Sequence, residues 1–378
     1  MPTRRSFLLD GAAILAASFA ARRASAAFGI EGELGHPVPP PPSLEFRTLS
    51  FEHSPLNGGP STAIAAVPRD LAPGEQLPLV VLLPGGHSNW QPHDAGCWCW
   101  WCEYNLGDCD TALRRGALTS ADFQDLARPE ELESFNRNLA SAPYRGVVIV
   151  TPWCLTRDSY LEPNGPMNSE WLRVLVDRCR AELPVIPTVA ATGLGGMSSG
   201  GLWAIYCGSH LPDVFGFVNA LQPYTRYLLT VLERAVLSRK GPQRLRIVGA
   251  FSDRIHEPTM ELVNLLRQDG IDLDYYEYLG MHDGRFVAGP GGIDTLFTFD
   301  RVLRGMGPDG LRPLPMQDGL AQELWFAADR ARVLPAAAPI APPSHANVAG
   351  TMGWASLAVG GAVLGVAAAR KIGGREGK

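Results

Sequence analysis

Apolar and polar positions follow two alternating patterns through the centre of the chain. Short continuous apolar runs such as Pro78–Leu83 are typical of strands that are covered on both faces. Between these runs, apolar residues recur at helical spacing, and in Ser169–Leu183 this spacing places them on one face. The two patterns alternate from Pro78 to about Arg304. They predict an α/β fold, with a mostly parallel central sheet and helices on both faces.

Two runs before this region, Leu44–Phe51 and Ser61–Val67, have strand character and are joined by the turn Asn57–Pro60. We expect them to form antiparallel strands at the edge of the sheet. The other predicted strands are 146–150, 188–196, 215–221, 244–251 and 272–279, and the other predicted helices are 120–139, 201–210, 227–237, 258–268 and 292–304.

Both ends of the chain differ from this pattern. Arg4-Arg5 precede the apolar run Gly11–Ala21 and the small residues Ala24–Ala26. This arrangement indicates a twin-arginine export signal, with a general secretory signal or an uncleaved anchor as alternatives. At the other end, the uncharged run Met352–Ala369 would make a helix about 27 Å long, and Arg370-Lys371 follow it. We expect this tail to associate with the membrane, and the alternatives are a sorting tail or a soluble helix.

These segments divide the 378 residues into five parts. We predict an export signal at 1–26, a Pro-rich spacer at 27–43, an α/β domain at 44–334 with an insertion at about 89–110, a Pro/Ala linker at 335–350 and a hydrophobic tail at 351–378. The predicted location is the periplasmic or cell-surface side, with anchoring in the inner membrane by 352–369. The formal charge is −5 and both ends are basic, so the domain itself is acidic. An acidic domain is a poor partner for nucleic acid.

Gly196-Met197-Ser198-Ser199-Gly200 is a G-x-S-x-G pentapeptide between a predicted strand and a predicted helix. In this setting the motif forms a tight turn that exposes the serine hydroxyl above the sheet. The pattern alone is weak evidence, because the chain contains 41 glycines. Its meaning depends on the residues that share its edge of the sheet.

Asp253 and His282 follow two later predicted strands, so they are expected at the same edge as Ser198. Ser, Asp and His in this chain order match the hydrolytic triad of α/β-hydrolases. Ser198 would attack a carbonyl, His282 would act as general base and Asp253 would orient the imidazole. The backbone N–H groups of Gly86 and Ser199 would bind the oxyanion. Glu257 is an alternative acid and His256 an alternative base.

The sequence resembles the α/β-hydrolase superfamily, in particular the putative-esterase branch that includes esterase D, feruloyl esterases and mycolyltransferases. The matching residues are Leu82–Gly86, Gly196–Gly201, Asp253 and Gly280–His282. The resemblance implies ester hydrolysis or acyl transfer through a serine acyl-enzyme, with no metal and no organic cofactor. It offers no account of the insertion after Gly86.

The insertion is rich in cysteine and tryptophan. In an exported protein, Cys97, Cys99, Cys102 and Cys109 are expected to form disulfides that hold a lid, with Cys154 as a further partner. A structural zinc site that includes His87 or His93 is the alternative. Cys179 and Cys207 are expected to be buried thiols on helices. The interleaved tryptophans are expected either to line a substrate pocket above Ser198 or to form the insertion's own core: Trp90, Trp98, Trp100 and Trp101.

The sequence therefore predicts an exported serine carboxylic-ester hydrolase that acts on a small-molecule acyl, phenolic or sugar ester. An acyltransferase with the same triad is the first alternative. A non-catalytic binding module on a hydrolase scaffold is the second.

Overall fold

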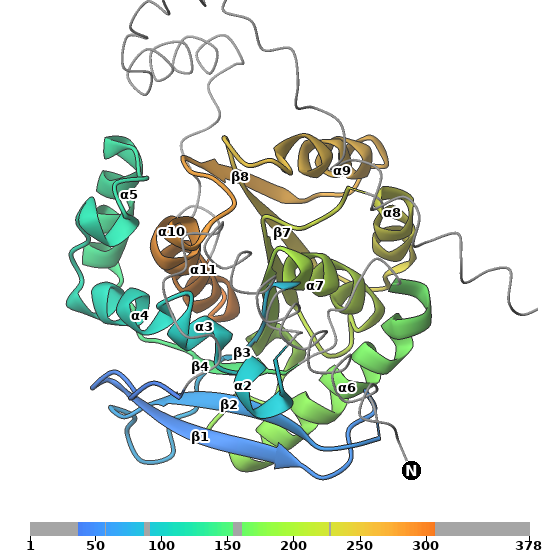
Figure 1. The fold of residues 1–378 in the computed structure, drawn as a ribbon. Helices are drawn as coiled ribbons and strands as arrows, with labels where there is room; N and C mark the ends of the chain where they lie inside the picture. Colours follow the sequence, from blue (N-terminus) through green and yellow to red (C-terminus); the bar gives the residue numbers. More distant parts are fainter. Residues whose placement is uncertain (1–36, 57, 87–90, 154–160, 227, 307–378) are drawn as a thin grey trace, which may run out of the picture. The chain divides into compact units, whose positions relative to one another are not determined.

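The computed structural model describes residues 37–56, 58–86, 91–153, 161–226 and 228–306. Within these ranges, eight strands form one sheet in the order β1-β2-β4-β3-β5-β6-β7-β8 (Figure 1). The strands are β1 Leu44–Phe51, β2 Ser61–Pro68, β3 Leu79–Leu83, β4 Val148–Pro152, β5 Thr192–Met197, β6 Phe217–Leu221, β7 Arg244–Ala250 and β8 Asp274–Tyr278. Strand β2 is antiparallel to both of its neighbours, β1 and β4. The strands β4, β3, β5, β6, β7 and β8 are parallel to one another.

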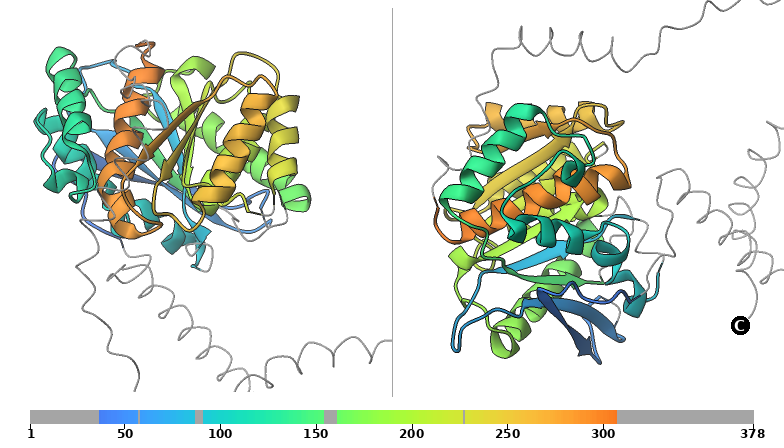
Figure 2. Two further views of the ribbon diagram at one scale, coloured as in Figure 1. Left: turned by 90° about the horizontal axis from the view of Figure 1, so that it is seen from above. Right: turned by 90° about the vertical axis from the view of Figure 1, so that its left-hand side faces the viewer.

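Helices cover both faces of this sheet (Figure 2). The contacting helices α6, α7, α8 and α9 form one layer, and α4, α5 and α11 lie on the other face. The helices are α2 His93–Gly96, α3 Cys99–Cys102, α4 Leu106–Arg115, η2 Ala121–Phe123, α5 Pro129–Ser141, α6 Leu161–Glu182, η3 Val189–Ala191, α7 Ser199–His210, α8 Leu229–Ser238, α9 His256–Gln268, α10 Gly284–Phe286, η4 Val287–Gly291 and α11 Gly292–Leu303. The predicted α/β-hydrolase fold, with a mostly parallel sheet between helices, is confirmed.

The predicted helix 120–139 is wrong in its first half. Only the short η2 forms there, and α5 begins at Pro129. The start of α5 is fixed by local contacts, because proline suits the first helical turn and the Arg128 N–H donates to Glu131 Oε2 at 2.6 Å. Helix α6 is longer than predicted, since it begins at Leu161 and includes Pro166.

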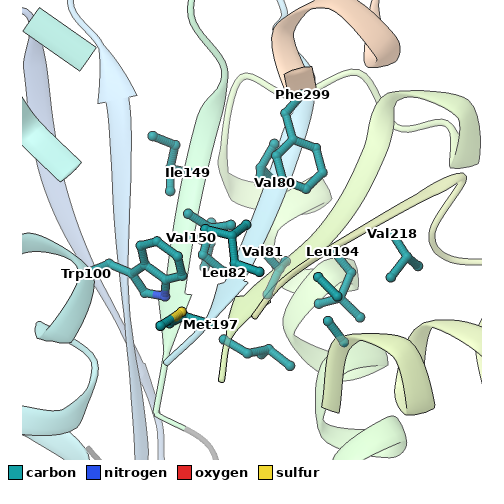
Figure 3. Close-up of a cluster of buried hydrophobic side chains, with 14 of the residues drawn as sticks. Val80, Val81, Leu82, Trp100, Ile149, Val150, Leu194, Met197, Val218 and Phe299 are labelled. Carbon is teal, nitrogen blue, oxygen red and sulfur yellow. The ribbon is translucent and has the colours of Figure 1, made fainter. Parts of the chain in front are cut away.

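Trp100 and Trp101 of the insertion belong to the core of the domain. Trp100 is 0% exposed and Trp101 is 4% exposed, and Figure 3 shows Trp100 among buried side chains of the central strands. The Trp101 Nε1–H donates to Thr151 Oγ1 on β4 at 3.0 Å, and its ring packs against Phe46 of β1. Trp98 is half-buried against the same Phe46. The burial of Trp100 and Trp101 favours the alternative that they form a core, and substrate binding by these tryptophans stays a prediction.

No disulfide joins the described cysteines, so the expected pairing among Cys97, Cys99, Cys102 and Cys109 is not formed, and a pairing with Cys154 is not tested. Three of the thiols have separate hydrogen-bond acceptors: Cys97 with Asp94 O, Cys99 with Glu103 Oε2 and Cys109 with Ala288 O. Cys179 on α6 and Cys207 on α7 are buried thiols, as predicted.

The zinc alternative finds no set of ligands in this part of the chain. Burial raises the pKa of Cys97 to about 12 and that of Cys99 well above its usual value. Among the described side chains, no group of three or more His, Cys, Asp or Glu is arranged to hold a metal ion. His93 instead shares a 2.9 Å hydrogen bond with Thr62 Oγ1, and His87 and Cys154 lie outside the described residues.

The predicted export signal, linker and C-terminal tail also lie outside the described residues, as does the predicted end of the domain at 334. Within the described ranges, no helix combines the length and the apolar character that crossing a membrane requires.

A buried ion pair joins α11 to the sheet. Arg246 of β7 donates two hydrogen bonds to the Asp294 carboxylate, and the Tyr278 hydroxyl of β8 donates to the same group at 2.7 Å. The side chains of Arg246 and Asp294 are only 9% and 3% exposed. The pair therefore connects two strands and a helix inside a region that water does not reach.

Replacing Arg246 by Met is expected to lower the free energy of unfolding by about 3–5 kcal/mol, because Asp294 would stay buried without its cation. Arg244→Met is the matched control on the same strand, since its pair with Asp274 is 40% and 56% exposed and is worth at most about 1 kcal/mol. Urea unfolding of both variants measures the difference. Equal losses would contradict the role of the buried pair.

Candidate active site

Ser198 occupies the turn between β5 and α7 in a backbone conformation that residues other than glycine rarely adopt. Its φ is 57° and its ψ is −117°, a strained combination that persists only when the surroundings enforce it. The Ser198 N–H donates to Leu221 O at 2.9 Å, and the Ser198 carbonyl accepts from the N–H groups of Leu202 and Tyr224. These bonds fix the turn to the neighbouring β6 and to the first turn of α7.

The two outer glycines of the pentapeptide are required by close contacts. A Cβ on Gly196 would lie 2.3 Å from Gly200 O, and a Cβ on Gly200 would lie 2.4 Å from Leu83 O and from Pro84 O. Because these neighbours are backbone atoms, they cannot move aside as a flexible side chain would. Gly200 thus lets α7 approach the end of β3, where Gly86 lies.

The structure brings the three predicted side chains together. His282 Nε2 lies 2.9 Å from Ser198 Oγ, and His282 Nδ1 lies 2.9 Å from Asp253 Oδ2. With the proton on Nδ1, the imidazole donates to the carboxylate and accepts from the serine hydroxyl. The Asp253 and His282 side chains are 2% and 7% exposed, and the Ile255 N–H donates to the other Asp253 oxygen at 2.9 Å. Asp253 follows β7 and His282 follows β8, so both come from the carboxyl ends of parallel strands.

The two alternative residues are placed elsewhere. Glu257 is exposed in the first turn of α9. His256 Nε2 lies 2.5 Å from Glu277 Oε1, and this hydrogen bond raises the pKa of His256. His256 is therefore engaged with a carboxylate of β8.

The two predicted oxyanion donors belong to adjacent pieces of backbone. A Cβ added to Gly86 would lie 2.9 Å from Ser199 Oγ, so the chain after β3 passes directly over the start of α7. Ser199 is the first residue of α7, and N–H groups in a first helical turn have no partner within the helix. The arrangement places the two residues side by side at the positive end of a helix dipole.

Tyr104 supports this loop from the insertion, and the sequence did not reveal it. Its hydroxyl is hydrogen-bonded to the Gly85 backbone and to Cys99, and burial raises the pKa of Tyr104 well above its usual value. Cys99 in turn donates to Glu103 Oε2 at 3.3 Å. The insertion therefore contributes a buried hydrogen-bond chain that reaches Gly85 in the loop after β3. Trp90, which was expected near this loop, lies outside the described residues.

Gln222 is a second residue that sequence reasoning missed. It follows β6 directly, is 0% exposed and has a φ of 39°. Its Nε2 donates to Met281 O at 2.9 Å, and its backbone N–H donates to Val248 O. Gln222 thus connects the strand beside Ser198 to the residue before His282. Its position at a strand end, where sites form in such sheets, was the available signal.

No protein-family model matches the sequence, and no curated protein matches it. Several solved structures are similar in fold. FphF, a fluorophosphonate-binding serine hydrolase of Staphylococcus aureus, is 13% identical over 70% of this chain and 98% of its own, with a TM-score of 0.46. A ferulic acid esterase is 14% identical over 69% and 99%, with a TM-score of 0.49. The CE1 ferulic acid esterase AmCE1/Fae1A of Anaeromyces mucronatus is 12% identical over 73% and 100%, with a TM-score of 0.48. The fold assignment rests on this chain's own strand order and serine turn.

The pair of His256 and Glu277 predicts a pH-dependent contribution to stability. Because the folded-state pKa of His256 is raised, its contribution is complete below the unfolded value of about 6.5 and is lost as pH rises through the folded value. His256→Gln should therefore lower the free energy of unfolding more at pH 5.5 than at pH 9. Urea unfolding at both pH values tests this. A loss that is the same at both would show that the pair has no pH-linked role.

Proposed function

We propose that the protein is a serine carboxylic-ester hydrolase that acts through an acyl-enzyme on Ser198. The observation that carries this proposal is the continuous hydrogen-bond chain from Ser198 Oγ through His282 to Asp253, with two contacts of 2.9 Å. A serine hydroxyl is a poor nucleophile until a base removes its proton. An imidazole at hydrogen-bond distance, held by a buried carboxylate, supplies that base.

In the acylation step, Ser198 Oγ forms a bond to the ester carbonyl carbon while His282 Nε2 takes the hydroxyl proton. The carbonyl electron pair moves onto oxygen, and the N–H groups of Gly86 and Ser199 stabilise the resulting negative charge. When the tetrahedral intermediate collapses, the bond to the alcohol oxygen breaks and His282 gives its proton to that oxygen. The alcohol departs and the acyl group remains on Ser198.

Water completes the cycle by the same route. His282 takes a proton from water as the water oxygen bonds to the acyl carbon. The second collapse breaks the bond between that carbon and Ser198 Oγ, returns the proton to Ser198 Oγ and releases the carboxylic acid. Asp253 stabilises the imidazolium in both steps and stays ionised. The strained backbone at Ser198 holds Oγ in place throughout, so reorganisation during the reaction is small. We also propose that the enzyme is exported by its N-terminal segment, on the support of the residues Arg4–Ala26.

Short p-nitrophenyl esters test the proposal directly. Ser198→Ala is expected to lower kcat on the order of 10⁶-fold, and Asp253→Asn on the order of 10⁴-fold, because the first removes the nucleophile and the second favours the wrong tautomer. Glu257→Gln is the matched control for the acid, because Glu257 is exposed. As a surface substitution it should change kcat by less than about twofold. If Ser198→Ala still turns over the ester, Ser198 is not the nucleophile. If Glu257→Gln loses most of its kcat, Glu257 and not Asp253 is the acid of the triad.

Gln222→Leu should lower kcat by up to about tenfold, because one hydrogen bond that holds the segment before His282 is lost. Gln243→Leu is the control: Gln243 is also buried and donates to Gly208 O and Phe215 O, away from the triad. Both variants should lose stability, but only Gln222→Leu should lose turnover at temperatures where both are folded. Equal kcat values would show that Gln222 has no part in positioning His282.

A further inference from the structure

Large apolar side chains that remain exposed are few in the described part of the chain. They are Val174, Tyr224, Leu237 and Met281. Val174 and Leu237 lie on the helices α6 and α8. Tyr224 and Met281 lie instead on the two loops that surround the triad, and Met281 is the most exposed of the four, at 55%.

The backbones of these two residues are fixed although their side chains are exposed. The Tyr224 N–H donates to the Ser198 carbonyl at 3.1 Å, and the Met281 carbonyl accepts from Gln222 Nε2 at 2.9 Å. Gln222 is two residues before Tyr224, so one short segment after β6 holds both positions. The backbone of Tyr224 is therefore bonded to Ser198, and the backbone of Met281, the residue before His282, is bonded to Gln222.

The chemistry of the proposed reaction relates Met281 to one part of the substrate. His282 must give its proton to the departing alcohol oxygen, so the alcohol part of an ester leaves along the side of the site where His282 lies. Met281 immediately precedes His282, and its carbonyl is held by Gln222. A flexible thioether and an aromatic ring are both suited to contacts with apolar groups of varied shape.

We propose that Tyr224 and Met281 form an apolar lip that binds the alcohol part of the substrate, and that the substrates are esters of apolar alkyl or aryl alcohols. This inference rests on the proposed ester hydrolysis and adds its substrate class. Covering the lip with the alcohol removes apolar surface from water on both sides, and each buried methylene raises kcat/KM by up to about fourfold.

Two matched ester series test the lip. Ethyl, butyl and hexyl acetate vary the alcohol with little change in its acidity, whereas ethyl acetate, butyrate and hexanoate vary the acyl group. The wild-type protein should hydrolyse hexyl acetate with a kcat/KM at least about tenfold that of ethyl acetate. Met281→Gln and Tyr224→Ser should bring this ratio below about threefold, and Leu237→Gln, which removes an exposed leucine away from the triad, should leave the ratio unchanged.

The lip would be refuted, and ester hydrolysis would still stand, in any of three cases. The kcat/KM values could be the same along the alcohol series, or the ratio of hexyl to ethyl acetate could be unchanged in both variants. Alternatively, kcat/KM could depend on length in the acyl series alone. Absence of all turnover would instead count against the proposed function, so binding is also measured without turnover. In Ser198→Ala with ¹³C-methyl methionine, 1-hexanol should shift the Met281 signal, assigned from Met281→Gln, and not that of the half-buried Met260 on α9. No shift at Met281, or an equal shift at Met260, would overturn the lip.

Discussion

The site depends on one strained turn. Ser198 sits at a φ of 57° between β5 and α7, and this conformation holds only because neighbouring backbone leaves no other path. Gly196 lies against Gly200, and Gly200 lies against the carbonyls of Leu83 and Pro84. The same contacts that strain the serine therefore bring the end of β3 to the start of α7. The position of Ser198 and the approach of Gly86 to Ser199 follow from a single packing constraint.

Buried polar contacts hold His282 and Asp253 in place relative to this turn. Ser198 is bonded to the end of β6, Gln222 continues from that strand to the segment before His282, and Asp253 holds the imidazole from β7. Each link uses a group that is shielded from water, where a hydrogen bond is stronger and an unpaired group is costly. The insertion adds Tyr104, whose hydroxyl is hydrogen-bonded to the Gly85 backbone in the loop after β3. The site is thus held from β3, β6, β7 and the insertion together.

Sequence patterns were sufficient for the parts of the site that local chemistry determines. The glycines around Ser198 and the strand ends before Asp253 and His282 are visible because turn geometry and strand burial leave local signatures. Gln222 was marked only by its position at a strand end and Tyr104 by nothing in the sequence, because their contacts are with distant residues: Met281, 59 residues away, for Gln222 and the Gly85 backbone for Tyr104. The tryptophans show the same limit. Trp100 and Trp101 have the composition of a binding surface, and only the packing of the insertion on β1 and β4 reveals that they are core.

Because of the strained turn and the buried His282–Asp253 pair, we expect Ser198, and not its neighbour Ser199, to be the reactive serine. Both serines are half-buried, but only Ser198 is hydrogen-bonded to His282, with 2.9 Å between Ser198 Oγ and His282 Nε2. Labelling with a fluorophosphonate, followed by peptide mapping by mass spectrometry, distinguishes them. We expect one modified residue, Ser198, and loss of labelling in the His282→Ala variant. Modification at Ser199, or labelling that persists without His282, would contradict it.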